Sequence, residues 1–308
     1  MIRFYKKRYV FIGISLAIML IGIIAGFVNG IDLAIDFKGG AVFRYNFTGE
    51  INTEEADRVI SEALGRNVSC LVTSDLATQT QRLVINVAGN EGISSQDQEK
   101  LDQVLKETFA DNELELYNST VVLPYFGKRF FRECLTAVFI SFVLIVLYVW
   151  LRFRKIGGLS AGVMALVALI HDVLVVFIAF IVFKIPLDEN FIAAALTIIG
   201  FSINDTIVIY DRIRENVSIM KKASFEELVD TSITQSITRS VNTNLATFAS
   251  ITIVYIFAQI YDISSIRSFA LPMMFGIISG CYSTICLAGP LWVMWKNYQK
   301  SHRKVKKA

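Results

Sequence analysis

Long apolar stretches, separated by shorter polar ones, cover most of the chain. An α-helix needs about 20 mostly apolar residues to cross a bilayer, because the hydrocarbon core is about 30 Å thick and each residue rises about 1.5 Å. The apolar stretches of that length lie near residues 9–28, 130–151, 157–183, 191–211, 240–259 and 268–295. This pattern predicts a polytopic α-helical membrane protein with six transmembrane helices.

Residues 31–128 have shorter hydrophobic periods, which are typical of a domain that folds in water. β-Branched runs alternate with amphipathic stretches, and together they predict the order β-α-β-β-α-β. The expected elements are Ala41–Phe47, Thr53–Leu64, Asn67–Thr73, Arg82–Val87, Ser94–Phe109 and Glu113–Leu123. This order is typical of an α+β ferredoxin-like domain, with both helices on one face of an antiparallel sheet. That fold hosts many functions, so it indicates no activity by itself.

Lysine and arginine residues are unevenly distributed around the six stretches. They gather in the N-terminal segment, between the second and third stretches, and in the C-terminal tail. Because basic loops stay on the cytoplasmic side, we expect both termini in the cytoplasm. The segment between the first two helices, with 8 basic and 16 acidic side chains, then lies outside. The expected division is an N-terminus with the first helix (1–30), an extracytoplasmic domain (31–128), five further helices (129–295) and a basic cytoplasmic tail (296–308).

The composition supports a membrane protein and argues against several other classes. Hydrophobic residues make up 54% of the chain and charged residues 19%, against roughly 45–50% and 25% in soluble proteins. The net charge of +3 is far from the clustered positive field of a nucleic-acid binder. Four cysteines and two histidines, without CxxC or HExxH spacing, do not suit a disulfide framework or a zinc site. We therefore expect no nucleic-acid partner, no metal and no cofactor.

A few polar residues fall inside the apolar stretches. Each intramembrane charge costs roughly 2.5–3.5 kcal/mol on insertion scales, so such residues usually face a bundle interior or water and are functional. Among them are His171 and Asp172 in the third helix, Asn204 and Asp205 in the fourth, and Arg239 at the start of the fifth. Helical spacing predicts one polar stripe on each of two consecutive helices, formed by Thr197, Gly200, Asn204 and Asp205, and by Arg239, Asn242, Thr243, Thr247 and Ser250. We expect these two stripes to meet.

Asp205 opposite Arg239 is the main candidate for chemistry. Burial and a nearby cation shift the pKa of a carboxyl group in opposite directions, so an acid subject to both can exchange a proton near neutral pH. One interpretation is a proton carrier whose protonation releases the arginine and lets two helices slide. The alternative is a structural ion pair that only fixes helix register. His171 is either a second relay member or a hydrogen-bonding group of the core. Asp172 and Asn204 complete the candidate residues for proton transport, and Asp172, like His171, either relays protons or only packs.

Four segments together resemble a known family. The run Ile199–Asn216 closely resembles the fourth-helix signature of the SecF family of the bacterial Sec protein-export machinery. Three shorter segments agree in the same order, namely Ile35–Gly40, His171–Val173 and Ser236–Ser240. The departures are small and leave Asp205 and Arg239 untouched. They are Ala34 in place of a usual glycine, Ile170 in place of a common alanine and Phe201 in place of a frequent tyrosine.

This resemblance implies a function that the residues alone do not give. It implies a partner of SecD, the two forming a pseudo-symmetric twelve-helix assembly of the resistance-nodulation-division superfamily in the inner (cytoplasmic) membrane. Such a pair uses the proton motive force to draw preproteins outward through the SecYEG channel after the ATPase SecA has pushed them. Within the family, Asp205 and Arg239 match the positions assigned to proton transport. Asp36, Gly39 and Gly40 match the motif at the junction between membrane and outer domain.

The two glycines of that junction allow two interpretations. Glycine tolerates backbone conformations that other residues avoid, so Gly39 and Gly40 can supply a hinge on which the outer domain swings. The alternative is an ordinary turn that leads into the first strand.

An enzyme is the first rival reading of the intramembrane acids. An aspartyl protease would need Asp172 and Asp205 at one depth to share a proton. Counted from the expected cytoplasmic edges, they lie ~22 Å and ~9 Å deep at about 1.5 Å per residue. The Tyr-Asp and Gly-x-Gly-Asp pairs of that class are absent from these positions. We therefore expect no enzyme and no catalytic residues.

A proton-coupled exporter of lipids or drugs is the second rival. Exporters of this superfamily also need an intramembrane carboxylate, but they usually carry two helical halves and two outer domains in one longer chain. This sequence has one of each, which favours a separate SecF-like subunit and leaves a self-dimerising half-transporter as the alternative.

Overall fold

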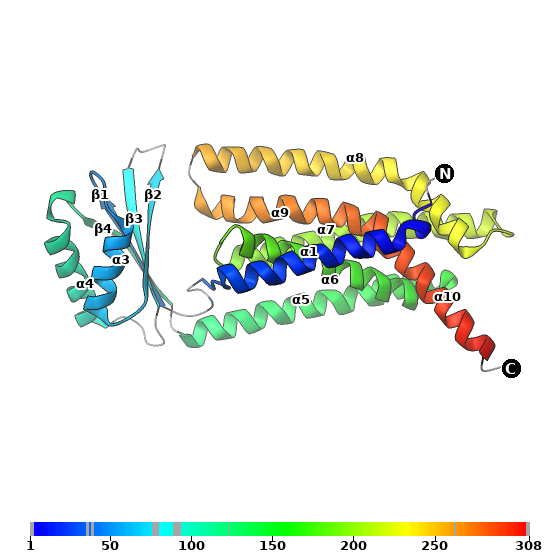
Figure 1. Cartoon of the computed structure of the whole chain (residues 1–308), viewed down its shortest axis with the longest axis horizontal. Coiled ribbons are helices and arrows are strands. Elements are labelled where there is room, and N and C mark those ends of the chain that lie inside the picture. Colours follow the sequence, from blue (N-terminus) through cyan, green and yellow to red (C-terminus); the bar gives the residue numbers. More distant parts are fainter. Residues whose placement is uncertain are drawn as a thin grey trace.

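The computed structural model describes residues 3–34, 37, 40–75, 80–88, 94–122, 124–261 and 263–305. A long helical bundle carries a small α+β domain at one end, and both chain termini lie at the opposite end (Figure 1). The bundle helices are α1 (Arg8–Asn29), α5 (Pro124–Arg152), α6 (Gly158–Val182), α7 (Glu189–Ile219), α8 (Phe225–Ile260), α9 (Ser264–Ser283) and α10 (Gly289–Val305). Short 3₁₀ turns at Tyr5–Lys7 and Arg154–Ile156 precede α1 and α6.

Six helical stretches of the bundle are long and apolar enough to cross a membrane. They are Tyr5–Asn29, Arg129–Arg152, Gly158–Val182, Glu189–Ile219, Phe225–Ile260 and Ser265–His302. The six predicted helices are confirmed, one in each stretch. The α8 helix has 36 residues, or ~54 Å at about 1.5 Å per residue. It therefore extends well beyond a bilayer, and the sequence pattern marked only its apolar half.

The ends of the long helices are defined by local hydrogen bonds. Ser224 caps α8 by accepting a hydrogen bond from the backbone amide of Glu227 at 3.1 Å, and Asp188 caps α7 by accepting one from the amide of Asn190 at 3.0 Å. Such caps satisfy amides that have no partner within the helix. Midway along its length, the last span changes to a π-helix at Thr284–Ala288 before α10 continues it.

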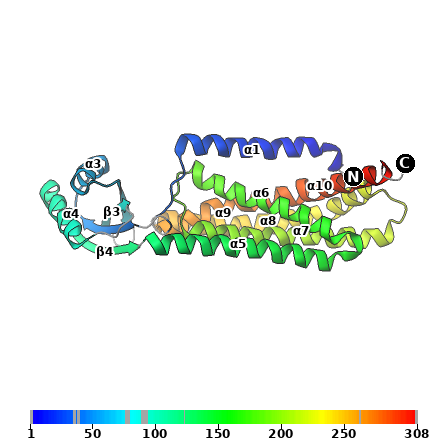
Figure 2. The same ribbon diagram turned by 90° about the horizontal axis from the view of Figure 1, so that it is seen from below.

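The helices divide into a buried centre and an exposed periphery. In α6, in α7 and in the stretch formed by α9 and α10, about half or more of the apolar segment is buried. In α1, α5 and α8, only about a tenth or less of it is buried. Figure 2 shows α1 and α5 on opposite sides of the bundle. The peripheral helices therefore leave most of their surface open to lipid or to another protein.

The small domain is a four-stranded antiparallel sheet with two helices. Its elements are β1 (Gly40–Phe47), α3 (Thr53–Leu64), β2 (Val68–Asp75), β3 (Thr80–Ala88), α4 (Ser95–Thr108) and β4 (Glu115–Val122), with a 3₁₀ turn at Ala110–Asn112. The strand order is β2-β3-β1-β4, and every neighbouring pair is antiparallel. The observed element order agrees with the order that the sequence pattern predicts.

Alternating residues of the strands form the core of this domain. Ala41, Phe43, Tyr45 and Phe47 of β1 face α3 and α4, and Leu83, Ile85 and Val87 of β3 join them. Asn52 begins α3 by accepting hydrogen bonds from the amides of Glu54 and Glu55. The Tyr45 hydroxyl donates to Oδ1 of Asp102 at 2.5 Å, and burial together with this carboxylate raises the pKa of Tyr45. Tyr45 therefore stays protonated and joins β1 to α4.

The chain passes between bundle and domain through a segment that is held at several points. After α1, Leu33 forms a parallel bridge with Leu187, and the amide of Ala34 donates to the carbonyl of Leu187 at 2.9 Å. Phe37 is buried and packs against Phe130 and Phe131 at the start of α5, with ring centroids 5.8 and 5.2 Å away. The domain is thus anchored to the turn between α6 and α7 and to α5.

The core assignment predicts the effect of truncating Phe43. Phe43→Ala is expected to lower the free energy of opening of the sheet by about 3–5 kcal/mol, because a large buried side chain is removed. Amide hydrogen exchange of β3 in the full chain measures this. Val121→Ala is the control, since Val121 is 48% exposed on β4 and its loss is expected to cost less than about 0.5 kcal/mol. Equal exchange in both variants would contradict the core assignment.

Candidate functional site

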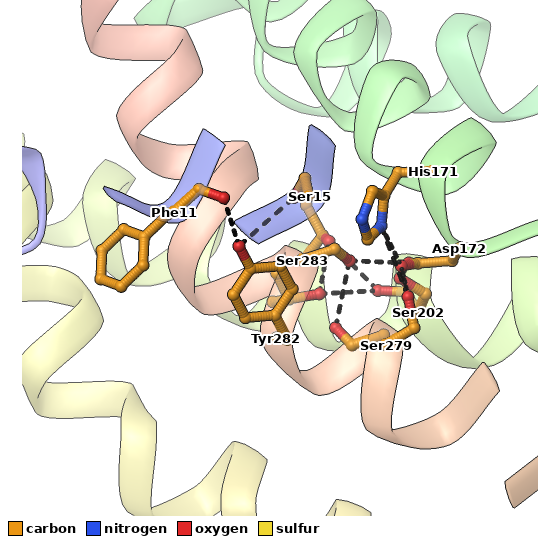
Figure 3. A network of polar contacts seen from close by, with 11 residues as sticks. Phe11, Ser15, His171, Asp172, Ser202, Ser279, Tyr282 and Ser283 are labelled. Atoms are coloured by element: carbon orange, nitrogen blue, oxygen red, sulfur yellow. Dashed lines mark hydrogen bonds and ion pairs between the residues drawn. The ribbon is translucent and has the colours of Figure 1, made fainter. Parts of the chain in front are cut away.

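A fully buried carboxylate lies where α6, α7 and α9 meet. Asp172 of α6 is 0% exposed. Its Oδ2 accepts hydrogen bonds from Ser202 of α7 and Ser283 of α9, both at 2.7 Å, and its Oδ1 accepts one from Ser279 of α9 at 2.6 Å. Figure 3 shows the three hydroxyl groups converging on this side chain. Because lipid cannot solvate the carboxylate, these donors replace its hydration.

The sequence brings these donors together through small residues. Ser279 and Ser283 are four residues apart, so they share one face of α9. On the same face, a Cβ atom on Gly280 would lie 3.3 Å from Cβ of Ser202, and one on Gly276 would lie 2.6 Å from Cγ1 of Ile198. Glycine at both positions therefore lets the backbone of α9 approach α7, which places the hydroxyl groups within reach of Asp172.

His171 is the immediate neighbour of this cluster. Its Nδ1 lies 3.2 Å from Oδ1 of Asp172 and 3.4 Å from Oγ of Ser279. Its buried Nε2 has no hydrogen-bond partner among the described residues. The ring also lies 6.0 Å, centroid to centroid, from Tyr282, whose hydroxyl donates to the carbonyl of Phe11 at 2.6 Å. The contacts therefore continue from α6 through α9 to α1 (Figure 3).

Asp205 lies in a different environment on α7. It is 4% exposed, and its Oδ2 accepts a hydrogen bond from the side-chain amide of Asn244 on α8. The same amide group donates to the carbonyl of Ser240 at 2.8 Å. Beside this contact, Oδ1 of Asn244 and the hydroxyl of Ser240 are buried without a hydrogen-bond partner in the described part of the chain. Asp205 thus has one side-chain donor where Asp172 has several.

Arg239 does not contact Asp205 directly. The arginine is exposed and lies close enough for electrostatic attraction to the carboxylate. No ion pair joins the two among the residues that the structure describes, because Asn244 occupies the place beside the carboxylate. A direct structural ion pair between these two side chains is therefore not what holds α7 to α8.

The two predicted polar stripes do not meet. Thr197, Gly200 and Asn204 of α7 are exposed, as are Arg239, Asn242 and Thr243 of α8. The buried row of α8 is instead formed by residues at intervals of four, namely Ser232, Ser236, Ser240 and Asn244. The Nδ2 group of Asn216 on α7 donates to Ser232 at 2.8 Å and to Gln235 at 2.9 Å. The physical reason is that α7 and α8 pack through this row, while the stripe containing Arg239 faces outward.

Sequence reasoning missed Asn244 and the serine residues that donate hydrogen bonds to Asp172. Asn244 lies five residues after Arg239 and so falls outside the stripe counted from that arginine. The serine and asparagine row at intervals of four was a visible signal for it. Ser279 and Ser283 show the same spacing beside Gly276 and Gly280. The π-helix that begins at Thr284 follows directly, and such distortions often mark functional sites.

The two acids have separate partners. Thr206 and Thr284 contact each other at 3.1 Å, and both donate to the carbonyl of Ser202, but neither hydroxyl bonds to Asp205. Among the described residues, no hydrogen bond joins the carboxyl groups of Asp172 and Asp205, whose partners are different side chains, so the two do not form the shared-proton pair of an aspartyl protease. Among the described residues, no group of three histidine, cysteine or acidic side chains is placed to hold a metal ion.

The junction motif is only partly visible. Gly40 begins β1 with a φ of 148°, a conformation that favours glycine. Asp36 and Gly39 lie outside the described residues, so the arrangement expected for them stays a prediction.

These observations define a polytopic membrane protein with six candidate spanning helices, a small antiparallel sheet at one end and two buried acids on adjacent central helices. The comparisons with known proteins identify the family. Residues 100–298 match the family described as "Protein export membrane protein SecD/SecF, C-terminal". A "Protein translocase subunit SecF" from Thermobaculum terrenum is 32% identical over 96% of this chain and 95% of its own length. The chain therefore belongs to the SecF family.

Longer relatives agree with this assignment. A "Protein translocase subunit SecDF" from Bacillus subtilis is 34% identical over 94% of this chain and 37% of its own length. The crystal structure of SecDF from Thermus thermophilus, described as a translocon-associated membrane protein, aligns with a TM-score of 0.77 and 28% identity. It covers 96% of this chain and 39% of the SecDF chain. The present chain thus spans about two fifths of the SecDF proteins that it resembles.

The hydroxyl cluster predicts a large structural role for Asp172. Asp172→Ala removes the acceptor of Ser202 and Ser279 and the nearer of two acceptors of Ser283, and a buried hydroxyl left without an acceptor costs about 1–3 kcal/mol. The melting temperature of the purified protein in detergent is expected to fall clearly. Thr197→Ala, on the exposed face of α7, is expected to leave it within about 1 °C, in keeping with a surface change under about 0.5 kcal/mol. Unchanged melting of Asp172→Ala would contradict this role.

Proposed function

We propose that this chain is an accessory subunit of the Sec translocase that works with SecD. The pair uses the proton motive force to complete the movement of preproteins through the SecYEG channel after SecA has acted. The observation that carries the proposal is Asp205, a buried acid at the contact between α7 and α8 with a single side-chain donor. Membership of the SecF family supplies the biological setting.

Protonation of Asp205 is the proposed switch. The carboxylate accepts a hydrogen bond from Asn244 and is attracted by Arg239, and charge-assisted bonds of this kind are about twice as strong as neutral ones. A proton on Asp205 removes the attraction to Arg239 and the charge assistance of the hydrogen bond from Asn244, and so weakens the contact between α7 and α8. The unpartnered groups of Asn244 and Ser240 beside it can bind water, which needs two to four polar partners at a buried site.

Asp172 has the fixed role in this proposal. Three hydroxyl groups and His171 surround its carboxylate, so its helices stay in register while α8 moves. We assign His171 to orienting Asp172 rather than to carrying protons. Asn204 is exposed on α7, and we place it on the surface next to the partner.

The partner is proposed from the exposed polar surface of α8. Arg239, Asn242 and Thr243 are exposed along a helix that lies at the periphery of the bundle. Polar side chains facing acyl chains are costly, so a protein surface should cover them. SecD is the natural candidate because relatives named SecDF are much longer chains that match this one over about two fifths of their length.

The proposal also assigns a fold and a side of the membrane to the small domain. We assign it to the ferredoxin-like fold, from its β-α-β-β-α-β order and its β2-β3-β1-β4 sheet. We place it outside the inner membrane and both termini in the cytoplasm, because lysine and arginine gather at the opposite end of the bundle. Gly40 serves as part of the hinge. One proton charge crossing 100 mV yields about 2.3 kcal/mol, which can bias a domain motion but cannot unfold a stable substrate.

The same superfamily offers a second candidate, a proton-coupled exporter of lipids or drugs. Purification of the assembled complex from membranes separates the two: SecD and SecYEG support the translocase role, whereas a homodimer loaded with lipid supports an exporter.

The proton switch predicts that Asp205→Asn abolishes the proton-driven stage of export. Asparagine has nearly the same shape but carries no titratable proton, so the variant should insert and bind SecD normally. Late-stage preprotein movement in inverted membrane vesicles, with and without a proton gradient, is the measurement. The variant is expected to move preprotein at the gradient-free rate under both conditions. Thr197→Val is the matched control on the same helix, and a gradient response in Asp205→Asn would remove this residue from the mechanism.

The absence of a direct ion pair gives a prediction for Arg239. Arg239→Lys keeps the positive charge and loses only the planar guanidinium, so we expect partial to substantial gradient-driven export. Arg239→Gln removes the charge and is expected to lose most of it. The same vesicle assay compares the two variants. Equal loss in both would mean that the guanidinium geometry, and not its charge, is what export requires.

A further inference from the structure

A cavity of about 880 Å³ lies between the small domain and the bundle. One wall is the face of the sheet that points away from α3 and α4, with Arg44 on β1 and Arg82 on β3. The other wall is formed by the turn after α6, the turn after α8 and the start of α9. Figure 1 shows this sheet opposite the nearby ends of α8 and α9. The volume is within the range of about 300–1,000 Å³ that is typical of ligand sites.

The charged residues among the described lining of this cavity all have the same sign. Its described lining residues include four cations, Arg44, Arg82, Lys184 and Arg267, and no acidic side chain. This is notable because residues 31–128 carry twice as many acidic as basic side chains. Arg82 also contacts Oδ1 of Asn46 at 3.3 Å and lies 4.4 Å from the ring centroid of Tyr117. A cleft lined by one sign of charge concentrates ligands of the opposite sign.

Lys184 adds a second observation. It has a φ of 53°, in the left-handed region that glycine usually occupies at a helix end. The amide of the next residue, Ile185, donates to the carbonyl of Phe180 at 2.9 Å, which closes the end of α6 as a helix-terminating motif. A lysine there is conformationally unfavourable, and such residues gather at functional sites. Its exposed side chain makes no hydrogen bond or ion pair in the described part of the chain.

The position of the cavity identifies the source of the anion. The wall that belongs to the bundle is formed by the ends of three membrane helices and contains Tyr255 and Tyr261. Tyrosine is enriched at the level of lipid headgroups. Phe183 lines the cavity at the end of α6. Its ring is exposed and lies 5.3 Å, centroid to centroid, from the exposed ring of Phe275 on α9. A ligand can thus place an anionic group in the cavity and an acyl chain along these rings.

We propose that this cavity binds the headgroup of an anionic phospholipid from the leaflet on the side of the small domain. Arg44 and Lys184 hold the phosphate, and Phe183 and Phe275 contact the chain. An extended peptide fits less well, because the cavity is lined by the face of the sheet, where the backbone groups are already paired. The lipid then tethers the small domain to the membrane surface. The inference depends on neither proton transport nor a translocation partner.

Binding of short-chain lipids to the full chain in detergent tests the proposal. Dioctanoyl phosphatidylglycerol is the anionic probe, and dioctanoyl phosphatidylcholine and glycerol phosphate are the comparisons. We expect at least tenfold tighter binding of phosphatidylglycerol than of either comparison, weakening as salt screens the charges. Equal binding of phosphatidylcholine would show that the site does not distinguish the net charge of the headgroup. Equal binding of glycerol phosphate would show that the acyl chains do not contribute to binding. Either result overturns the lipid site.

Variants locate the site. Arg44→Gln combined with Lys184→Gly is expected to reduce phosphatidylglycerol affinity at least tenfold. Lys184→Gly relieves the left-handed backbone, so the melting temperature of this variant without lipid should not fall. Lys221→Gln with Lys222→Gln removes the same charge from the exposed turn before α8, at the opposite end of the bundle, and should bind like the unchanged protein. Unchanged affinity in the cavity variant, or displacement of the lipid by an acidic unstructured peptide at equal concentration, would overturn the proposal.

Discussion

The central helices of this protein are arranged around a carboxylate that lipid cannot solvate. Asp172 is fully buried, and hydroxyl groups from α7 and α9 supply its donors. Removing any one of these helices would leave a charge in a medium of low polarity, which costs several kcal/mol. The requirement also explains the glycines of α9, because hydroxyl groups are short and reach the acid only when the helix backbones lie close together.

The contrast between the two buried acids separates a fixed part of the bundle from a part that can change. Asp172 accepts several hydrogen bonds, so a change at this position would have to break all of them together. Asp205 accepts one from Asn244, and buried groups without partners lie beside it. Partly satisfied polar networks are costly in a static core, but they are suitable where a proton and water must arrive and leave. In the proposed switch, the peripheral position of α8 lets it respond without disturbing the helices around Asp172.

Much of the fold followed from hydrophobic periods, but the site did so only in part. Six apolar stretches and the shorter hydrophobic periods of residues 31–128 predicted the elements, because each element of the small domain buries one of its faces. The stripe of α8 that contains Arg239 was expected to face α7, yet Asn244 does so. Hydrophobic periodicity assumes that polar residues avoid the buried face. Both the buried and the exposed face of α8 carry polar residues. The spacing of polar residues alone therefore does not distinguish the face that packs on α7 from the face that is exposed.

The connection between bundle and small domain determines what a change at α8 can move. The segment after α1 is hydrogen-bonded to Leu187 in the turn between α6 and α7, and Phe37 is packed against the start of α5. A relative shift of α5 against α6 would therefore pull on both attachments of the small domain. The proposed lipid tether, at the face of the sheet where Arg44 and Lys184 line the cavity, would limit the resulting movement of the small domain. Under that proposal the small domain is held at two places, and its freedom depends on how firmly each one binds.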